Sequence, residues 1–329
     1  MNKPSLKQGC TNPRVKRKFN EFVIKVIQYS LVISIGFMIL YPVLKMISTA
    51  FTSPNDLGNP LSFWIPENPS TIILKLCSRI LKPDQSLLLS MAYSGALMVI
   101  QLISSAVVGY GLARFNFKGK NLIFAGVILT IIVPPQTMIL SQYLNYRYFD
   151  FFGMIEMVNG ESINLLNNTP AYFMIALLGH GLKSGLFIFI FRQFFRGLPK
   201  ELEEAASIDG AGYVKTFVQI MLPTTVPAML TVGVFSFAWN YGDTYYSSLF
   251  VKSGTDLLSL IMNTQVSNTN VITGAYSALT GFEIDQVSPF LLQAIRGTSL
   301  LIFISPLLIL YFIVQRKFVE SFERSGITG

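Results

Sequence analysis

The sequence has 329 residues, of which 51% are hydrophobic and only 13% are charged, and its formal net charge is +8. Ionisable residues are absent from five long segments, at 26–44, 85–113, 121–146, 216–242 and 297–315. A helix needs about 20 mainly apolar residues to cross the hydrocarbon core of a bilayer. The composition therefore excludes a soluble globular protein and indicates membrane spans.

We predict an all-α polytopic membrane protein with six transmembrane helices. They are expected at 22–48, 86–112, 121–143, 170–195, 225–249 and 290–314. Pro134 and Pro135 break the third span, and His180 and Lys183 interrupt the fourth. Spanning helices accept such breaks only where neighbouring protein or water satisfies the freed carbonyl groups, so we expect the proline break to be packed inside the protein.

Basic residues predict the orientation, because loops on the cytoplasmic side are enriched in Lys and Arg. With the N-terminus inside, sixteen Lys and Arg residues face the cytoplasm and five face outward. This gives a basic cytoplasmic tail at 1–21, a six-helix transmembrane domain at 22–314 with a cytoplasmic loop at 196–222, and a cytoplasmic C-terminal tail at 315–329. The topology accounts for the positive charge, and we expect no nucleic-acid partner.

The loop at 196–222 is polar, acidic and longer than a simple hairpin connection. Glu201, Glu203 and Glu204 lie where the positive end of a helix dipole favours acids, and Gly210 is suited to the left-handed conformation that ends a helix. We therefore predict a short helix, a tight turn at 210–212 and a second helix that runs to Leu222. The alternative is a solvated amphipathic connector with no partner.

The spacing of this loop resembles a known motif. Glu204, Ala205 and Ala206 are followed by Gly210 and then by the segment IMLP, at 220–223. This pattern is similar to the EAA loop of the integral-membrane subunits of ATP-binding-cassette (ABC) importers. The segments YPVLKMISTAF, GYGLARFNFKGK, IIVPPQTMIL and VQRKFVESFERSGITG also resemble carbohydrate-uptake permeases of the maltose-permease second-subunit type.

The resemblance implies a type I ABC importer permease fold in the bacterial cytoplasmic membrane. It also implies a second permease subunit, two cytoplasmic ATP-binding subunits, an extracytoplasmic solute-binding protein and a carbohydrate substrate. Carried over residue by residue, it assigns contact with the ATPase to Glu203, Glu204, Ala205, Ala206, Asp209 and Gly210. The sequence departs from the family in an enlarged polar segment around 159–168.

The sequence gives no indication of catalysis. It has no phosphate-binding loop of the form GxxxxGK[ST], because Gly119 and Lys120 are followed by Asn121. It has one histidine and no HExxH or GxSxG pattern. We therefore expect no catalytic residue, metal site or cofactor in this chain, and we expect partner subunits to bind ATP.

Polar and aromatic residues near the outer ends of the last two spans are candidates for the substrate pathway. They are Trp239, Asn240, Asp243, Tyr245, Tyr246 and Arg296. Aromatic faces and amide groups suit a sugar, but Tyr and Trp also belt membrane interfaces whatever the substrate. Asp243 and Arg296 lie at similar depth and could instead form a structural ion pair.

Three alternatives to a sugar importer remain at this point. The solute could be a polyol or a glycerol-phosphate-like compound. The chain could be a self-contained channel or secondary transporter, which would leave the EAA spacing unexplained. A membrane-bound enzyme is disfavoured by the missing nucleophile, base and metal clusters.

Overall fold

The structure, a computed structural model, describes residues 13–252 and 254–326. Within these residues the chain is helical, and the only β-structure is two isolated bridges, Thr52 with Pro69 and Phe149 with Ile163. The chain divides into two compact units, residues 1–75 with 288–301, and residues 76–287 with 302–329. Residues 1–12 of the predicted basic tail lie outside the described residues.

The first unit holds one long helix and the first part of another, which lie in the first and sixth predicted spans. It contains α1 (Pro13–Ala50), η1 (Pro54–Asp56), η2 (Pro60–Ser62) and the first parts of α2 (Ile72–Leu81) and α16 (Pro289–Gly326). The segment after α1 folds back onto it, with the Trp64 ring 5.3 Å from the ring of Tyr41. Lys45 donates a hydrogen bond to the carbonyl oxygen of Phe63. The proline-rich segment after the first span is therefore not one helix, as expected.

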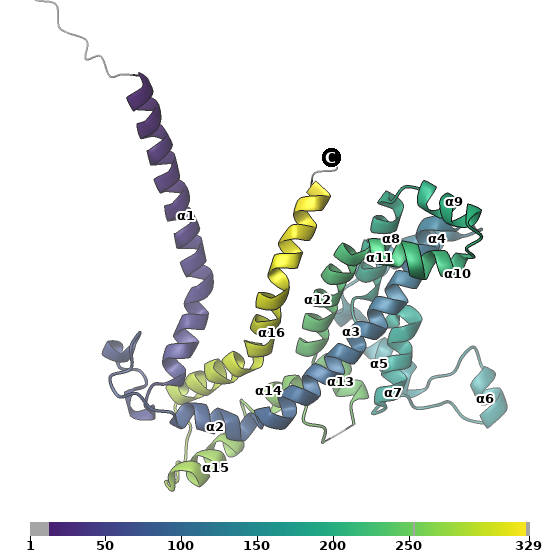
Figure 1. The fold of residues 1–329 in the computed structure, drawn as a ribbon. Helices are drawn as coiled ribbons and strands as arrows, with labels where there is room; N and C mark the ends of the chain where they lie inside the picture. The colour runs from purple at the N-terminus through teal and green to yellow at the C-terminus, as the bar shows by residue number, and fades with distance from the viewer. Residues whose placement is uncertain (1–12, 253, 327–329) are drawn as a thin grey trace, which may run out of the picture. The chain divides into compact units, whose positions relative to one another are not determined.

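The second unit is a bundle with short helices at its ends (Figure 1). Its helices are α3 (Pro83–Arg114), α4 (Lys120–Ile132), η3 (Pro135–Met138), α5 (Ile139–Arg147), α6 (Met154–Asn159), α7 (Thr169–Ile175), η4 (Ala176–His180), α8 (Ser184–Gly197), α9 (Glu201–Ile208), α10 (Tyr213–Thr216), η5 (Phe217–Met221), α11 (Leu222–Thr224), α12 (Val226–Gly242), α13 (Tyr245–Phe250), α14 (Leu258–Thr264) and α15 (Thr269–Thr280). The long helix α3 packs against α8 and α12.

Close packing of α3 on α8 depends on one glycine. A Cβ atom added at Gly109 would lie 2.7 Å from Cβ of Phe191 and 3.0 Å from the backbone nitrogen of Arg192. Around this contact the buried side chains form one apolar cluster, made of Ala106, Tyr110, Phe187, Phe191, Phe195, Met221, Ala228 and Val232. This cluster lies next to α9, because the partly buried Leu202 packs against it, and a second buried cluster forms around Tyr172 and Phe250.

Four described helical segments are long and apolar enough to cross a membrane: 17–50, 83–114, 169–197 and 289–316. They correspond to the first, second, fourth and sixth predicted spans. A fifth is reached if the pair 213–224 and 226–242, bent by 78°, forms one span. The sixth predicted span continues as helix through residue 326, beyond the boundary at 315 that we predicted for the tail.

The predicted third span is not one continuous helix. Its apolar part, α4, has only 13 residues, and the chain leaves the helix at Val133 before η3 and α5. Pro134 and Pro135 explain the break, because proline removes a backbone donor and its ring clashes with the preceding turn. The predicted break at these prolines is confirmed, but Pro134 is exposed and is not packed inside the bundle.

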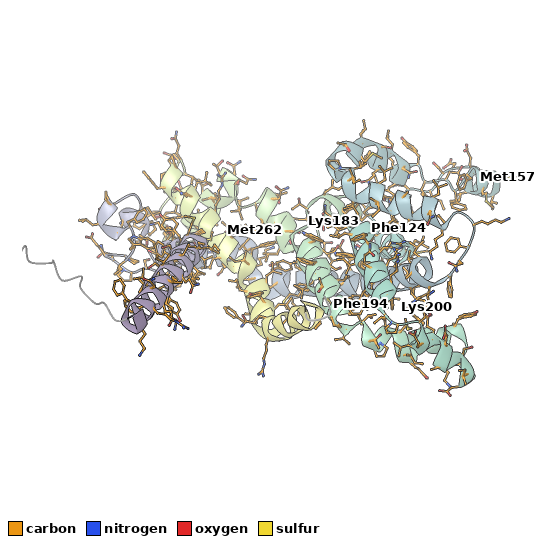
Figure 2. The ribbon with its side chains drawn as sticks, turned by 90° about the horizontal axis from the view of Figure 1, so that it is seen from above. Phe124, Met157, Lys183, Phe194, Lys200 and Met262 are labelled. Carbon is orange, nitrogen blue, oxygen red and sulfur yellow. The ribbon has the colours of Figure 1, made fainter. Side chains whose placement is uncertain are left out.

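The segment between α5 and α7 extends away from the bundle. Figures 1 and 2 show α6 at the tip of this segment, with Met157 pointing outward. Met157 is 90% exposed and Val158 is 82% exposed. This is the region in which the sequence departs from the permease pattern.

Candidate functional site

The loop predicted at 196–222 folds as a helical hairpin. Helix α9 ends at a turn in which Gly210 has a φ of +74°. The backbone nitrogen of Ala211 donates to the carbonyl of Ala206, which closes the helix end in the way a glycine at this position permits. Helices α10, η5 and α11 then continue to Thr224. The predicted helix, turn and second helix are confirmed.

The hairpin has an inner and an outer face, and the six candidate docking residues are divided between them. Glu204, Ala205, Asp209 and Gly210 are exposed. Ala206 is only 3% exposed, and so it packs inward. Ala205 and Ala206 therefore do not share a face, and only Ala205 lies open to a second protein.

Glu203, the remaining candidate, ties α9 to the end of α3. The Tyr110 hydroxyl donates to Oε1 of Glu203 at 2.8 Å. Arg114 Nε lies 3.5 Å from the same oxygen, an ion pair rather than a hydrogen bond, and Arg114 Nη2 donates to the carbonyl of Leu198 at 2.7 Å. Hydrogen bonds to charged groups are about twice as strong as neutral ones, so this anchor holds the hairpin on the bundle.

Tyr110 and Arg114 lie about 90 residues before Glu203 in the chain and are not among the predicted site residues. The motif GYGLAR, at 109–114, contains both of them, but nothing in its spacing indicates that its side chains reach the loop.

The turn that follows α3 is basic. There the ammonium of Lys120 donates to the carbonyl of Phe115, and burial together with neighbouring arginines lowers the pKa of Lys120.

The outer face of the hairpin also carries apolar side chains that the prediction omitted. Ile208 is 86% exposed, Tyr213 is 76% exposed and Val214 is 78% exposed. They bracket the turn at Gly210, next to Glu204 and the other exposed candidates. Contiguous exposed apolar side chains with a polar rim are typical of protein interaction sites.

Among the pathway candidates, Asn240 belongs to a buried polar network. It is 2% exposed, and its Nδ2 donates to Oε1 of Gln101 at 2.9 Å. Gln101 Oε1 also accepts from the Ser236 hydroxyl, and its Nε2 donates to the carbonyl of Leu182 at 3.0 Å. The network connects α3 and α12 to the break before α8. Gln101 is the central residue of this network, and no pattern in the sequence indicates it.

Asp243 caps the start of α13. Its Oδ2 accepts hydrogen bonds from the backbone nitrogen of Ser247 at 2.8 Å and from the Ser247 hydroxyl at 3.1 Å. Arg296 lies exposed in the part of α16 that belongs to the first unit. The structure describes the two units separately, and the ion pair between Asp243 and Arg296 therefore stays a prediction.

The three aromatic candidates pack against other rings. Trp239 stacks on Phe187 and Phe235, with centroid distances of 5.8 and 5.4 Å. Tyr245 contacts Tyr246 edge to face at 5.0 Å. Their contact with a substrate stays a prediction, but the stacking fixes the orientation of each ring.

A helical bundle with several membrane-length helices defines an integral-membrane protein. The chain belongs to the family of binding-protein-dependent transport system inner membrane components, which matches residues 105–324. The matched region contains the hairpin and the helices α4, α8 and α12. Members of this family are transport components and not enzymes.

Individual relatives agree with this membership. The chain is 26% identical over 236 residues to the alpha-glucoside transport system permease protein AglG of Rhizobium meliloti (strain 1021), which covers 70% of this chain and 53% of that protein. It is 26% identical over 307 residues to the arabinooligosaccharides transport system permease protein AraQ of Halalkalibacterium halodurans, covering 90% and 93%.

A solved structure has the same fold. A chain from the crystal structure of a bacterial ABC transporter involved in the import of the acidic polysaccharide alginate aligns with a TM-score of 0.64 at 16% identity. The alignment covers 91% of this chain and 98% of that one. The chain therefore has the type I ABC importer permease fold.

Proposed function

We propose that this chain is a permease subunit of an ATP-driven importer of a sugar or oligosaccharide, in the bacterial cytoplasmic membrane with both termini inside. Family membership supports the importer, and the two relatives described above are named for carbohydrate substrates. The partners are a second permease subunit, two ATP-binding subunits and an extracytoplasmic solute-binding protein. ATP is bound by the partners, and this chain needs no cofactor of its own.

The hairpin couples the bundle to the ATPase in this proposal. The observation that carries it is the division of the hairpin into an exposed face and an anchored face. Glu204, Ala205, Asp209 and Gly210 would contact the ATP-binding subunit, while Glu203 and Ala206 hold the helix on the bundle. Movement of the ATPase would then reach α3 through Glu203, because a packed helix moves as a rigid body.

The proposal is tested in proteoliposomes that contain the chain purified with its partners. We expect uptake of a labelled α-glucoside or arabino-oligosaccharide that requires ATP and the binding protein. The variant Glu204→Lys should assemble in the membrane but lose uptake, because it reverses a charge on the docking face. Glu156→Lys makes the same charge reversal on the exposed face of α6 and should leave uptake unchanged.

Uptake that proceeds without ATP would contradict the proposal and would favour a channel or a secondary transporter. Full ATP-dependent uptake by Glu204→Lys would contradict only the role of the hairpin. Accumulation of glycerol phosphate in place of sugars would support an ATP-driven importer but would contradict the proposed sugar substrate.

A further inference from the structure

Three predicted spans of the second unit are interrupted at a similar distance from the end that carries α9. Helix α4 runs 13 residues to its break, α8 has 14 residues after its break, and α12 runs 17 residues to Asp243. At 1.5 Å per residue these lengths are about 20–26 Å, against a hydrocarbon core about 30 Å thick. Each of these helices is therefore interrupted before it could cross the whole core.

Non-helical backbone at membrane depth is tolerated only where it is buried in protein or lines a water-filled cavity. In transporters built from broken helices, such breaks commonly form the substrate site. Here Gly179 has a φ of +82° and Lys183 has a φ of +59°, so the backbone leaves the helical conformation in a turn between η4 and α8. This turn forms one wall of a cavity.

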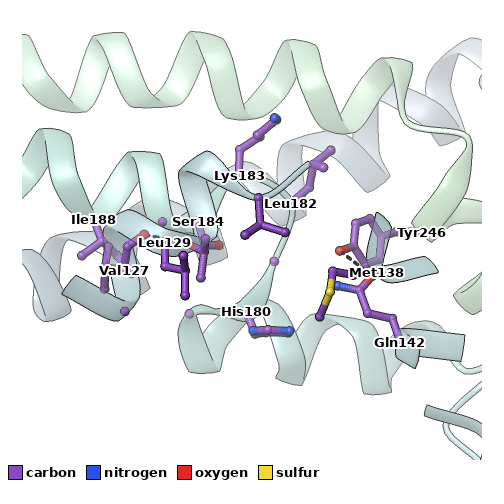
Figure 3. Close-up of a pocket in the computed structure, with 16 residues that line it drawn as sticks. Val127, Leu129, Met138, Gln142, His180, Leu182, Lys183, Ser184, Ile188 and Tyr246 are labelled. Carbon is purple, nitrogen blue, oxygen red and sulfur yellow. Dashed lines mark hydrogen bonds between the residues drawn. The ribbon is translucent and has the colours of Figure 1, made fainter. Parts of the chain in front are cut away.

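The cavity has a volume of about 470 Å³. Small-molecule sites usually fall between about 300 and 1,000 Å³. Its walls come from α4 with Val133, from Met138 and α5, from the turn and the start of α8, and from Tyr246 of α13. Figure 3 shows Ser184 and Val127 at one end of the cavity, and Tyr246 with Gln142 at the other.

Polar groups stand at both ends of this mainly apolar cavity. Ser184 lines it and is 2% exposed, and its buried hydroxyl makes no hydrogen bond to any described residue. A buried hydroxyl without a partner costs about 1–3 kcal/mol, and so it indicates a ligand or water at that point. At the other end the Tyr246 hydroxyl donates to Oε1 of Gln142 at 3.2 Å.

Charge selects the class of ligand. None of the lining residues is Asp or Glu, so the walls offer no counter-ion to a cationic solute. Lys183 is a lining residue, but its side chain turns away from His180 (Figure 3), and its ammonium lies 5.9 Å from the centroid of the Trp239 ring. An ionised solute in apolar surroundings needs a paired charge. The walls therefore suit an uncharged solute with hydroxyl groups.

We infer that this cavity binds a saccharide unit of the transported solute during its passage. Ser184 and the Gln142 amide would hydrogen-bond sugar hydroxyls, while Val133 and Ile188 would cover its C–H surface. The inference rests on the proposed function and adds a binding site in this subunit and the residues that form it.

The test uses the assembled transporter and compares variants of matched chemistry. Val133→Trp fills the cavity, whereas Ile132→Trp places the same side chain at an exposed neighbour outside the lining. Ser184→Ala removes the unpaired hydroxyl, whereas Ser105→Ala removes another buried and unpaired hydroxyl that does not line the cavity. The measurements are uptake of labelled maltose or arabinobiose and the rate of ATP hydrolysis.

We expect Val133→Trp to lose uptake at least tenfold while it still assembles and hydrolyses ATP, and Ile132→Trp to keep uptake. Ser184→Ala should raise the KM for uptake several-fold, with Ser105→Ala unchanged. An unchanged KM in Ser184→Ala together with full uptake by Val133→Trp would overturn the site, as would co-purification of a lipid that sugars do not displace. Absence of ATP-dependent uptake in the unaltered transporter would instead refute the proposed function.

Discussion

The anchor between Glu203 and α3 predicts a measurable change in local stability. Tyr110→Phe removes the donor of the 2.8 Å hydrogen bond to the Glu203 carboxylate and keeps the ring in the aromatic cluster with Phe195 and Phe217. A hydrogen bond to a charged group contributes about 1.5–3 kcal/mol. Since about 1.4 kcal/mol is a factor of ten in an equilibrium, opening of α9 from the bundle should become roughly 10 to 100 times more frequent.

Amide hydrogen exchange measures this opening directly. In the assembled transporter without nucleotide, the amides of α9 should exchange at least tenfold faster in Tyr110→Phe than in the unaltered chain. Tyr213→Phe is the matched control. The Tyr213 ring contacts Phe115, as the Tyr110 ring does, but Tyr213 is 76% exposed. Equal exchange of α9 in the two variants would refute the reasoning that Glu203 holds the hairpin in place.

Three further substitutions follow from the packing. Gly109→Ala should lower the melting temperature and the yield of folded protein, because its Cβ would lie 2.7 Å from Phe191. Gly111→Ala meets nothing closer than 4.0 Å and should be neutral, so equal melting temperatures of the two variants would contradict this. Gln101→Leu should lower the melting temperature, because the variant leaves buried polar partners unpaired, and an unchanged value would show that the network is dispensable. Gly210→Ala should cost about 1–2 kcal/mol through its left-handed backbone and reduce uptake, and full uptake with unaltered exchange at the turn would argue against that strain.

Much of the fold could be predicted from the sequence, because charge-free apolar runs leave few alternatives to a membrane helix. The spans at 22–48, 86–112 and 290–314 lie within observed helices for this reason. The hairpin was also predictable, since a glycine at 210 and acids at 201–204 act through local backbone and dipole effects. The break in the third span was predictable as well, because Pro134 and Pro135 lie within it and proline cannot continue a helix.

The side-chain arrangement of the site could not be predicted in the same way. The Glu203 side chain points toward the bundle because it contacts Tyr110 and Arg114. These two residues lie on α3, far from Glu203 in the sequence, and meet it only in the folded chain. Ala205 and Ala206 were both assigned to ATPase contact, but the structure exposes the first and buries the second. Asn240 was interpreted as a pathway residue from its residue type, yet its amide is committed to Gln101. Contacts between distant segments decide all three.

The most direct test of the central claim is photo-crosslinking from the exposed face of the hairpin. A benzoylphenylalanine at position 205 should cross-link to the ATP-binding subunit in the active transporter, with a yield that changes when ATP binds. The same group at position 157 of α6, which is also exposed, should give no such product. An active transporter in which position 205 never cross-links to an ATP-binding subunit would contradict the account.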